Sequence, residues 1–296
     1  MIRNPSVQGA LMALSAFGVY ALSDMMIKFM GQSHFAVQII FCAALCSLPF
    51  ILMQAATSAG GMSLRPALPK WTVVRIVLIV VNSVIVSYTF TKLPVAQAYA
   101  IFFCTPLLIT LLAVPLLRER LDLPRILTVV AGFAGVLIAL RPGSVPLQFA
   151  HLTAITGATL GALNSLLLRK VGDRERPSVV LLYPAIAQVL ILGCFLPWIW
   201  QPMTALSWFL ALMIGFLSTI GGVLIIKAYG RAPAIVVAPM QYSQIIWGTL
   251  CGVLIFGERM DALMVLGISV IVAAGLFLLW KSGQPLPGSA EFSQKS

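Results

Sequence analysis

Long apolar runs separated by short polar turns dominate the pattern along this chain. A helix that crosses the hydrocarbon core of a bilayer needs about 20 mostly apolar residues. The runs lack the alternation of apolar and polar positions that a membrane barrel strand shows, so we expect helices. Ten spans are predicted, at residues 8–30, 35–55, 70–91, 94–117, 124–141, 151–171, 177–199, 206–228, 232–256 and 262–281.

Composition supports an integral membrane protein. Hydrophobic residues make up 60% of the 296 positions and charged residues 9%, whereas an ordinary soluble domain carries about 25% charged residues. This excludes a soluble enzyme, a disordered protein and a disulfide scaffold. The five cysteines all lie inside apolar runs and are interpreted as free, small hydrophobic side chains. We find no phosphate-binding loop, dinucleotide fingerprint or zinc-binding helix motif, so we expect no cofactor and no metal.

Basic residues in the turns predict the orientation. With the N-terminus in the cytoplasm, 15 of the 19 Lys and Arg residues fall in cytoplasmic segments and 4 on the opposite side. This count includes Arg75 among the cytoplasmic residues. Such a bias follows the positive-inside rule, so we expect a multi-pass protein of the bacterial inner membrane with both termini in the cytoplasm. Residues 282–296 are small, polar and rich in Pro and Gly, which predicts a disordered cytoplasmic tail.

The chain also contains an internal repeat. Residues 89–122 align without gaps with residues 228–261, an offset of 139, and an offset of 141 pairs Lys28 with Arg169. Apolar helices resemble one another by chance, but the matched positions include polar residues. We therefore predict five-helix repeats at 1–145 and 146–281. Because five is odd, the second copy enters the membrane from the opposite side, and such inverted repeats place a substrate between the halves.

The repeated segments resemble a known family. Pro106, the Glu119–Arg120 pair and a glycine-containing helix after it in the first half, and Gly257–Glu258–Arg259 in the second, look like the EamA repeat of the drug/metabolite transporter superfamily. The first half departs from the pattern with Arg118 in place of the glycine. The resemblance implies a transporter of small molecules and not an enzyme. Inverted halves are expected to work by alternating access, and without a phosphate-binding loop we expect transport that does not use ATP.

Within the superfamily, bacterial exporters of aromatic and other neutral amino acids look closest. The alternative is efflux of lipophilic cations or drugs by proton antiport. A membrane enzyme would need a surface cluster of acids, histidines or nucleophiles, which the sequence lacks, and a structural subunit would show no solute flux. We expect the partners to be a small-molecule substrate and membrane lipid, with no nucleic acid, and the monomer to be functional.

Polar residues in the predicted spans are the candidate substrate-binding groups, because polar side chains at membrane depth need partners. Aromatic residues would form the walls and amides the hydrogen-bonding groups of a cavity. Hydrogen bonding between helices is the competing interpretation. The candidates are Asn82, Tyr99, Phe102, Asn164, Gln241, Tyr242, Gln244 and Trp247.

Asp24 is the one acid placed deep inside a predicted span, and Lys28 follows it by one helical turn. The pair could form a stabilising ion pair, or Asp24 could line a cavity and carry a proton. Glu119 with Arg120, and Glu258 with Arg259, end two spans and are interpreted as structural clasps. Pro106 and Pro239 lie inside spans, where each permits a hinge or a static bend.

Overall fold

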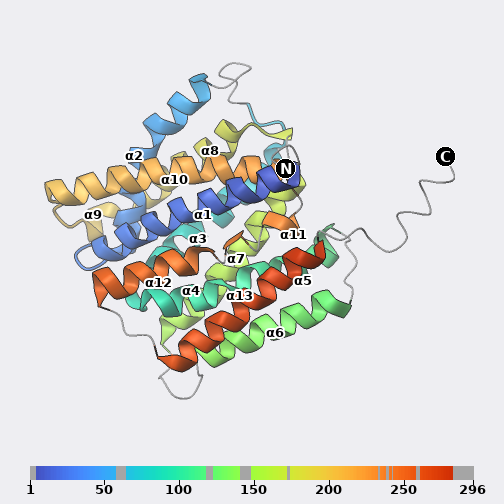
Figure 1. Cartoon of the computed structure of the whole chain (residues 1–296). Helices are drawn as coiled ribbons and strands as arrows, with labels where there is room; N and C mark the ends of the chain where they lie inside the picture. Colours follow the sequence, from blue (N-terminus) through green and yellow to red (C-terminus); the bar gives the residue numbers. More distant parts are fainter. Residues whose placement is uncertain are drawn as a thin grey trace, which may run out of the picture.

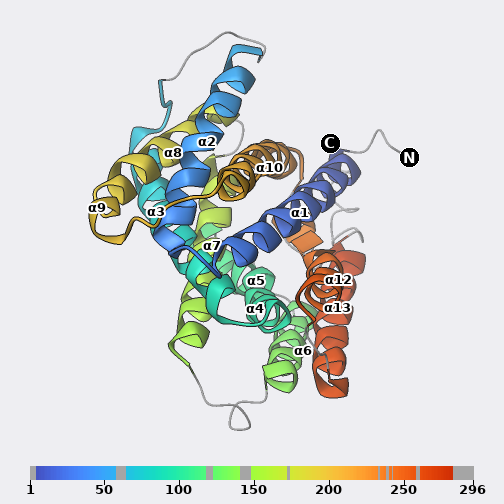
Figure 2. The same ribbon diagram turned by 90° about the vertical axis from the view of Figure 1, so that its left-hand side faces the viewer.

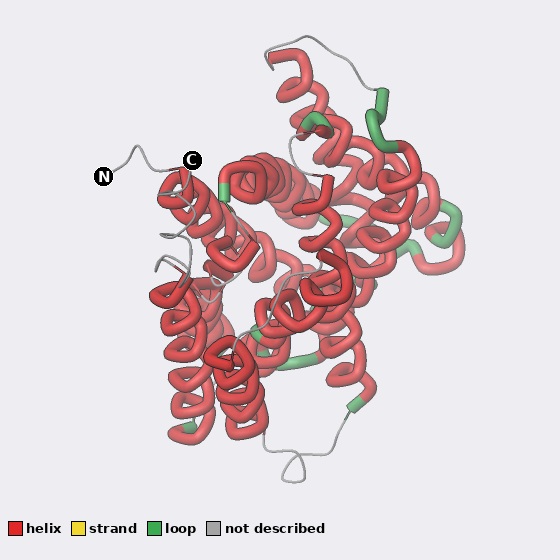
Figure 3. Tube along the Cα trace, turned by 90° about the vertical axis from the view of Figure 1, so that its right-hand side faces the viewer, coloured by secondary structure: helices red, strands yellow, loops and turns green. Residues whose placement is uncertain are grey.

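The computed structural model describes residues 5–57, 65–117, 123–140, 148–171, 174–232, 234–237, 240–241, 243–257 and 261–282. All regular structure in these residues is helical, as the sequence predicts (Figures 1 and 3). The helices are α1 (Pro5–Met30), α2 (Ala36–Thr57), α3 (Pro69–Lys92), α4 (Val95–Phe102), α5 (Cys104–Leu117), α6 (Leu123–Leu140), α7 (Phe149–Val171), α8 (Pro177–Gly193), α9 (Leu196–Ile199), α10 (Ala205–Arg231), α11 (Ala234–Val237), α12 (Ser243–Phe256) and α13 (Ala262–Ser282).

Helices occupy all ten predicted runs, with ends that differ by a few residues. In the described residues, α1, α2, α3, α7 and α10 are each long and apolar enough to cross a membrane. The predicted run 94–117 contains α4 and α5, the run 177–199 contains α8 and α9, and the run 232–256 contains α11 and α12. The chain is therefore an all-helical protein with several apolar spans.

The division between α4 and α5 has a local cause. Phe103 lies between the two helices with φ −71° and ψ −7°, which departs from the regular helical angles. A proline at position 106 has no N–H to donate to the carbonyl of Phe102, four residues earlier, and its ring crowds that carbonyl. The helix is interrupted at the residue that follows the affected carbonyl. Pro106 itself is within α5, and its side chain lies outside the described set.

Two pairs of long helices form the centre of the bundle. In Figures 1 and 2, α1 runs beside α10, and α3 packs against α7. The α3–α7 pair is antiparallel, because Thr89 hydrogen-bonds Thr153 while Arg75, nearer the start of α3, bonds Asn164, nearer the end of α7. The internal repeat equates α1 with α7 and α3 with α10, so the two pairings are the same contact with the halves exchanged.

Buried apolar side chains form two main clusters, one towards each end of these pairs. The first gathers aromatic rings around Phe90, whose ring centroid lies 5.3 Å from that of Tyr99. The second surrounds Leu166 and Tyr229. Helices α6 and α13 pack together at one edge of the bundle, on the opposite side from α2 and α8 (Figure 2).

Helix α10 approaches α2 closely at a glycine. A Cβ atom built on Gly215 would lie 2.8 Å from the carbonyl oxygen of Ala43 and 2.8 Å from the nitrogen of Ser47. Small residues allow two helix backbones to meet in this way inside a membrane. The contact holds α2 of the first half against α10 of the second, and both helices contribute to the cavity described below.

Candidate functional site

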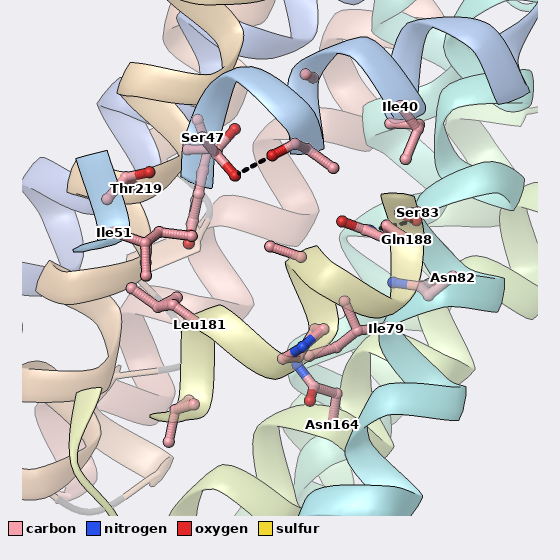
Figure 4. A pocket seen from close by; sticks show the side chains of 18 of the residues that line it. Ile40, Ser47, Ile51, Ile79, Asn82, Ser83, Asn164, Leu181, Gln188 and Thr219 are labelled. Atoms are coloured by element: carbon pink, nitrogen blue, oxygen red, sulfur yellow. Dashed lines mark hydrogen bonds between the residues drawn. The ribbon is translucent and has the colours of Figure 1, made fainter. Parts of the chain in front are cut away.

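A cavity of about 370 Å³ lies between helices of the two repeats. Three of its helices, α1, α2 and α3, come from the first half, and α7, α8 and α10 come from the second. Figure 4 shows Ser47 and Thr219 on one side of the space, with Ser83, Gln188 and Asn82 on the other. The volume falls at the lower end of the range typical of small-molecule sites. We refer to this space as the central cavity.

Most of the wall is apolar, but the polar groups are concentrated on α3, α7 and α8. The Nε of Arg75 donates to Oδ1 of Asn164 at 3.1 Å, which joins the two halves across the cavity. Gln188 Nε2 donates to Oγ of Ser83 at 2.8 Å. Oδ1 of Asn82 is buried and accepts no hydrogen bond within the described residues. The cavity therefore contains one guanidinium group and three amides.

Two hydroxyl groups in the wall are satisfied by their own helices. Ser47 Oγ donates to the carbonyl of Ala44 at 2.7 Å, and Thr219 Oγ1 donates to that of Gly215 at 2.8 Å. Because their protons are engaged, these hydroxyls offer only acceptor lone pairs to a ligand. This side of the cavity is thus weakly polar, whereas the side formed by α3 and α7 carries the charge.

Asp24 is the centre of a second polar cluster. The hydroxyl of Tyr99 donates to Asp24 Oδ2 at 2.8 Å, and Nε2 of Gln244 donates to the same oxygen at 3.4 Å. Tyr99 and Gln244 are buried. The cluster joins α1, α4 and α12, and these three residues are not among those that line the central cavity. The sequence candidates are therefore divided between two sites.

Asn82 and Asn164 are the two sequence candidates that line the central cavity. Phe102 is buried with its ring centroid 5.4 Å from that of Phe90, and Gln241 is half-buried. Trp247 is 49% exposed and lies near Gly18 on α1. Tyr242 lies outside the described residues, as do Pro239, Glu119, Arg120, Glu258 and Arg259.

Lys28 contacts the end of α3. Its Nζ donates to the carbonyl of Leu93 at 3.2 Å. Arg169, its partner in the repeat, has the equivalent bond, because Nη1 donates to the carbonyl of Tyr229 near the end of α10 at 3.2 Å. In both halves, a basic residue near the end of the first helix therefore hydrogen-bonds a backbone carbonyl at the end of the third helix.

A second pair of contacts joins the halves at opposite ends of the bundle. His34 Nε2 and Ser207 Oγ hydrogen-bond at 3.0 Å, which we term the His34 contact. The backbone N–H of Leu68 donates to Oε1 of Glu175 at 2.6 Å, which we term the Glu175 contact. The repeat offsets equate His34 with Glu175 and Leu68 with Ser207. Each contact joins the connection between the first two helices of one half to the start of the third helix of the other.

Sequence reasoning missed Arg75 and Gln188. Arg75 was counted as a cytoplasmic residue, but it lies inside α3, is 6% exposed and lines the central cavity. A usable signal was present, because Arg75 and Asn82 are seven residues apart and share a helical face. No comparable signal marks Gln188. Within the described residues, no group of three or more His, Cys, Asp or Glu side chains could hold a metal.

Comparison with known proteins places the chain in a transporter family. The EamA-like transporter family matches residues 7–141 and 148–280. The S-adenosylmethionine uptake transporter of Rickettsia prowazekii is 23% identical and covers 92% of each chain, and the riboflavin transporter of Vibrio cholerae is 26% identical over 94% of each. The pseudopaline exporter of Pseudomonas aeruginosa is 24% identical over 94% of this chain and 98% of its own.

The fold also has a counterpart among solved structures. One crystal structure covers 95% of this chain and 99% of its own with a TM-score of 0.69 and 17% sequence identity. At that identity the likeness concerns the fold alone.

Proposed function

Because the chain belongs to the EamA-like transporter family, we propose that it carries a small amphipathic metabolite across the membrane by alternating access, with the central cavity as the binding site. Membership of the family makes the chain a multi-pass transporter of small molecules and not an enzyme. What we propose beyond family membership is the kind of substrate and the alternating-access mechanism.

The observation that carries the proposal is a cavity between two repeats with an inter-half contact near each end. The His34 contact lies next to the end of α1, and Lys28 near that end bonds the carbonyl of Leu93 just after α3. The Glu175 contact involves Leu68, just before the start of α3. Helix α3 has 24 residues, and at 1.5 Å per residue it separates the two contacts by about 36 Å. Breaking one contact while keeping the other would open the cavity to one side only.

Helix directions support an inverted arrangement of ten spans. Helices α1 and α3 end together, and α7 runs antiparallel to α3. Helix α7 therefore runs against α1, its counterpart in the repeat. This is the relation expected for five-helix halves at 1–145 and 146–281 that enter the membrane from opposite sides. The basic residues then favour the bacterial inner membrane with both termini, and the tail at 282–296, in the cytoplasm.

The nature of the substrate is supported by the cavity wall. Apolar side chains from all six helices of the cavity, three amides and one guanidinium suit a molecule with an apolar body and a polar head. The named relatives transport S-adenosylmethionine, riboflavin and pseudopaline, and none of them is an amino-acid exporter. Export of aromatic or neutral amino acids, expected from the sequence, is retained as one candidate, with Asn82 and Asn164 as the binding groups.

Counterflow in proteoliposomes tests the proposal. Purified protein is loaded with an unlabelled compound, and uptake of the labelled compound is measured for S-adenosylmethionine, riboflavin and phenylalanine. Accelerated exchange of at least one compound, reduced by Asn82→Ala or Asn164→Ala, is expected. Tyr99→Phe is the control. It removes a hydroxyl of the Asp24 cluster, outside the cavity wall, and should not reduce exchange in the same way. A folded protein that exchanged none of these solutes would contradict the proposal.

A second candidate is efflux of lipophilic cations by proton antiport. It is favoured by Asp24, whose carboxylate accepts hydrogen bonds from Tyr99 and Gln244 inside the bundle. Exchange of a quaternary phosphonium in the same assay, with no exchange of the three metabolites, would select this candidate. With either substrate, the cavity is lined by residues of one chain, so we expect the monomer to be active.

A further inference from the structure

Arg75 has an unusual environment for a cation inside an apolar bundle. The side chain is 6% exposed and lines the central cavity. The hydrogen bond that it makes in the described part of the chain runs from Nε to Asn164. Glu175, the acid that interacts electrostatically with Arg75, lines a small adjoining pocket with it and accepts from the backbone of Leu68 through Oε1. Among the described residues, the two terminal amino groups of the guanidinium therefore face the charge of Glu175 but make no hydrogen bond.

The terminal N–H groups of Arg75 still need hydrogen-bond acceptors. A buried cation is costly unless it is paired and its N–H groups are hydrogen-bonded. Asn164 occupies Nε and so fixes the plane of the guanidinium, which leaves the edge formed by Nη1 and Nη2. That edge matches the two oxygens of a carboxylate in a planar, bidentate arrangement. A lysine at this position would offer the charge without this geometry.

A hydrogen-bond acceptor without a donor lies two helical turns further along α3. Oδ1 of Asn82 is buried and accepts no hydrogen bond within the described residues. Asn82 lies seven residues after Arg75 on the same helical face, a rise of about 10 Å. The cavity thus combines unpaired donors at one position with an unpaired acceptor at the other, and Ile27, Ile40 and Ile51 are in the apolar wall.

We propose that the transported metabolite carries a carboxylate that binds the Nη1–Nη2 edge of Arg75, with a hydrogen-bond donor of the same molecule on Asn82. The proposal rests on the proposed function and names its substrate class. A carboxylate is favoured over a phosphate because Arg75 is the one cation among the residues found to line the central cavity. Since Arg75 already interacts with Glu175, it would balance a second negative charge on the ligand poorly.

The test compares ligands that differ only in the carboxylate. The pairs are S-adenosylmethionine with its decarboxylated form, and phenylalanine with phenethylamine, together with phenyl phosphate, riboflavin and a quaternary phosphonium. Affinities are measured from the shift in melting temperature of the purified, detergent-solubilised full chain. In at least one pair, the carboxylate should bind the wild type about 10- to 100-fold more tightly than its partner, as expected for a charged hydrogen-bonded pair.

Variants then assign the preference to Arg75. Arg75→Gln should reduce the ratio within each pair to near one, and Arg75→Lys should give an intermediate ratio because it keeps the charge but loses the fork. Arg65→Gln makes the same change at an exposed arginine and should leave the ratio unaltered. If Arg75→Gln does not fold, the affinity ratios of the wild type and of Arg75→Lys still test the carboxylate assignment.

Each outcome has a defined meaning. Equal affinity within every pair in the wild type, a ratio that persists in Arg75→Gln, or tighter binding of phenyl phosphate would overturn the carboxylate assignment. Binding of only riboflavin or the phosphonium would also overturn it and leave transport through the cavity intact. If no compound binds a folded wild type, the result counts against the proposed function itself.

Discussion

A single methyl group at position 215 would meet the backbone of α2. The built Cβ lies 2.8 Å from the carbonyl oxygen of Ala43, and a backbone atom cannot move aside as the tip of a flexible side chain can. We predict that Gly215→Ala destabilises the protein by about 1–3 kcal/mol, the usual cost of overpacking. The melting temperature in detergent measures the effect.

Gly161→Ala is the matched control. The nearest atoms to a Cβ at Gly161 are 3.9 Å away, on Asn82 and Thr105, which is ordinary van der Waals contact. This variant should melt close to the wild type. Equal melting temperatures for the two alanine variants would contradict the close approach of α10 to α2.

Asp24→Asn separates a proton-carrying role from a structural one. The amide oxygen of asparagine can still accept from Tyr99, so the fold should persist, but the exchangeable carboxyl proton is lost. If Asp24 couples transport to protons, the variant should keep counterflow and lose the dependence of flux on an imposed pH gradient. Tyr99→Phe keeps the carboxyl group and should keep the dependence. An unchanged gradient response in Asp24→Asn would assign Asp24 a structural role.

Individual residues were predictable when their type alone was informative. Asn82 and Asn164 stood out as amides in apolar runs, and both line the central cavity. Arg75 lies early in its run, where a basic residue also fits a cytoplasmic turn, so local sequence could not separate the two placements. The bond between Arg75 and Asn164 joins positions 89 residues apart, and pairings of this kind depend on how the helices pack.

At the scale of helices, the two inter-half contacts should control opposite faces. A cysteine at Ser218, in the wall of the central cavity, can report opening after the five native cysteines are replaced. His34→Ala removes one contact and should increase labelling by an impermeant thiol reagent from the face that carries residues 31–35. Glu175→Ala should increase labelling from the opposite face. Increases on the same face for both variants would contradict the assignment.

The His34 contact should also respond to acid. Burial lowers the pKa of His34 below its ordinary value of 6.5, and its Nδ1 is buried with no hydrogen-bond partner in the described residues. A protonated ring would leave a second N–H donor unsatisfied there. The broken contact, in which the ring reaches water, therefore binds the proton more tightly and gains population as the pH falls through the lowered pKa.

Labelling of the Ser218 cysteine at decreasing pH measures this effect. Access from the face with residues 31–35 should increase in acid for the wild type, whereas His34→Gln, which has no titrating group, should show no such increase. The same acid response in His34→Gln would assign it to another group.

Helix positions were predictable because run length and hydropathy are local properties. Helices α1, α2 and α3 begin and end within a few residues of the runs that predict them. The interruption at Phe103 was not predicted at its position, although Pro106 indicated a bend nearby. A proline acts on the carbonyl four residues earlier, so the departure from helical geometry precedes the residue that causes it.

At the scale of the whole chain, the repeat makes a topological prediction. Ten spans with both termini in the cytoplasm require reporter fusions at the N-terminus and after residue 282 to report the same face. A fusion in the segment 58–64 should also report the cytoplasm, and one at residue 148 should report the opposite side. Termini on different faces would contradict the ten-span, inverted arrangement.

The family was recognisable from the repeated motifs, because the matched segments cover nearly the whole chain. The central cavity was not, since it forms where α1, α2 and α3 meet α7, α8 and α10. The repeat indicates that the two halves are related. The face that each helix presents to the other half depends on packing between distant segments.

The two inter-half contacts occupy equivalent places in the repeat and yet differ in chemistry. In an ancestor built from two identical copies, one substitution would have altered both sides of the assembly together. In this single chain, an imidazole–hydroxyl pair joins the halves at one end and a carboxylate–amide pair joins them at the other. If the two contacts close opposite faces, as proposed, a substitution at one of them would change how readily the cavity opens to one compartment and would leave the residues of the cavity wall unchanged.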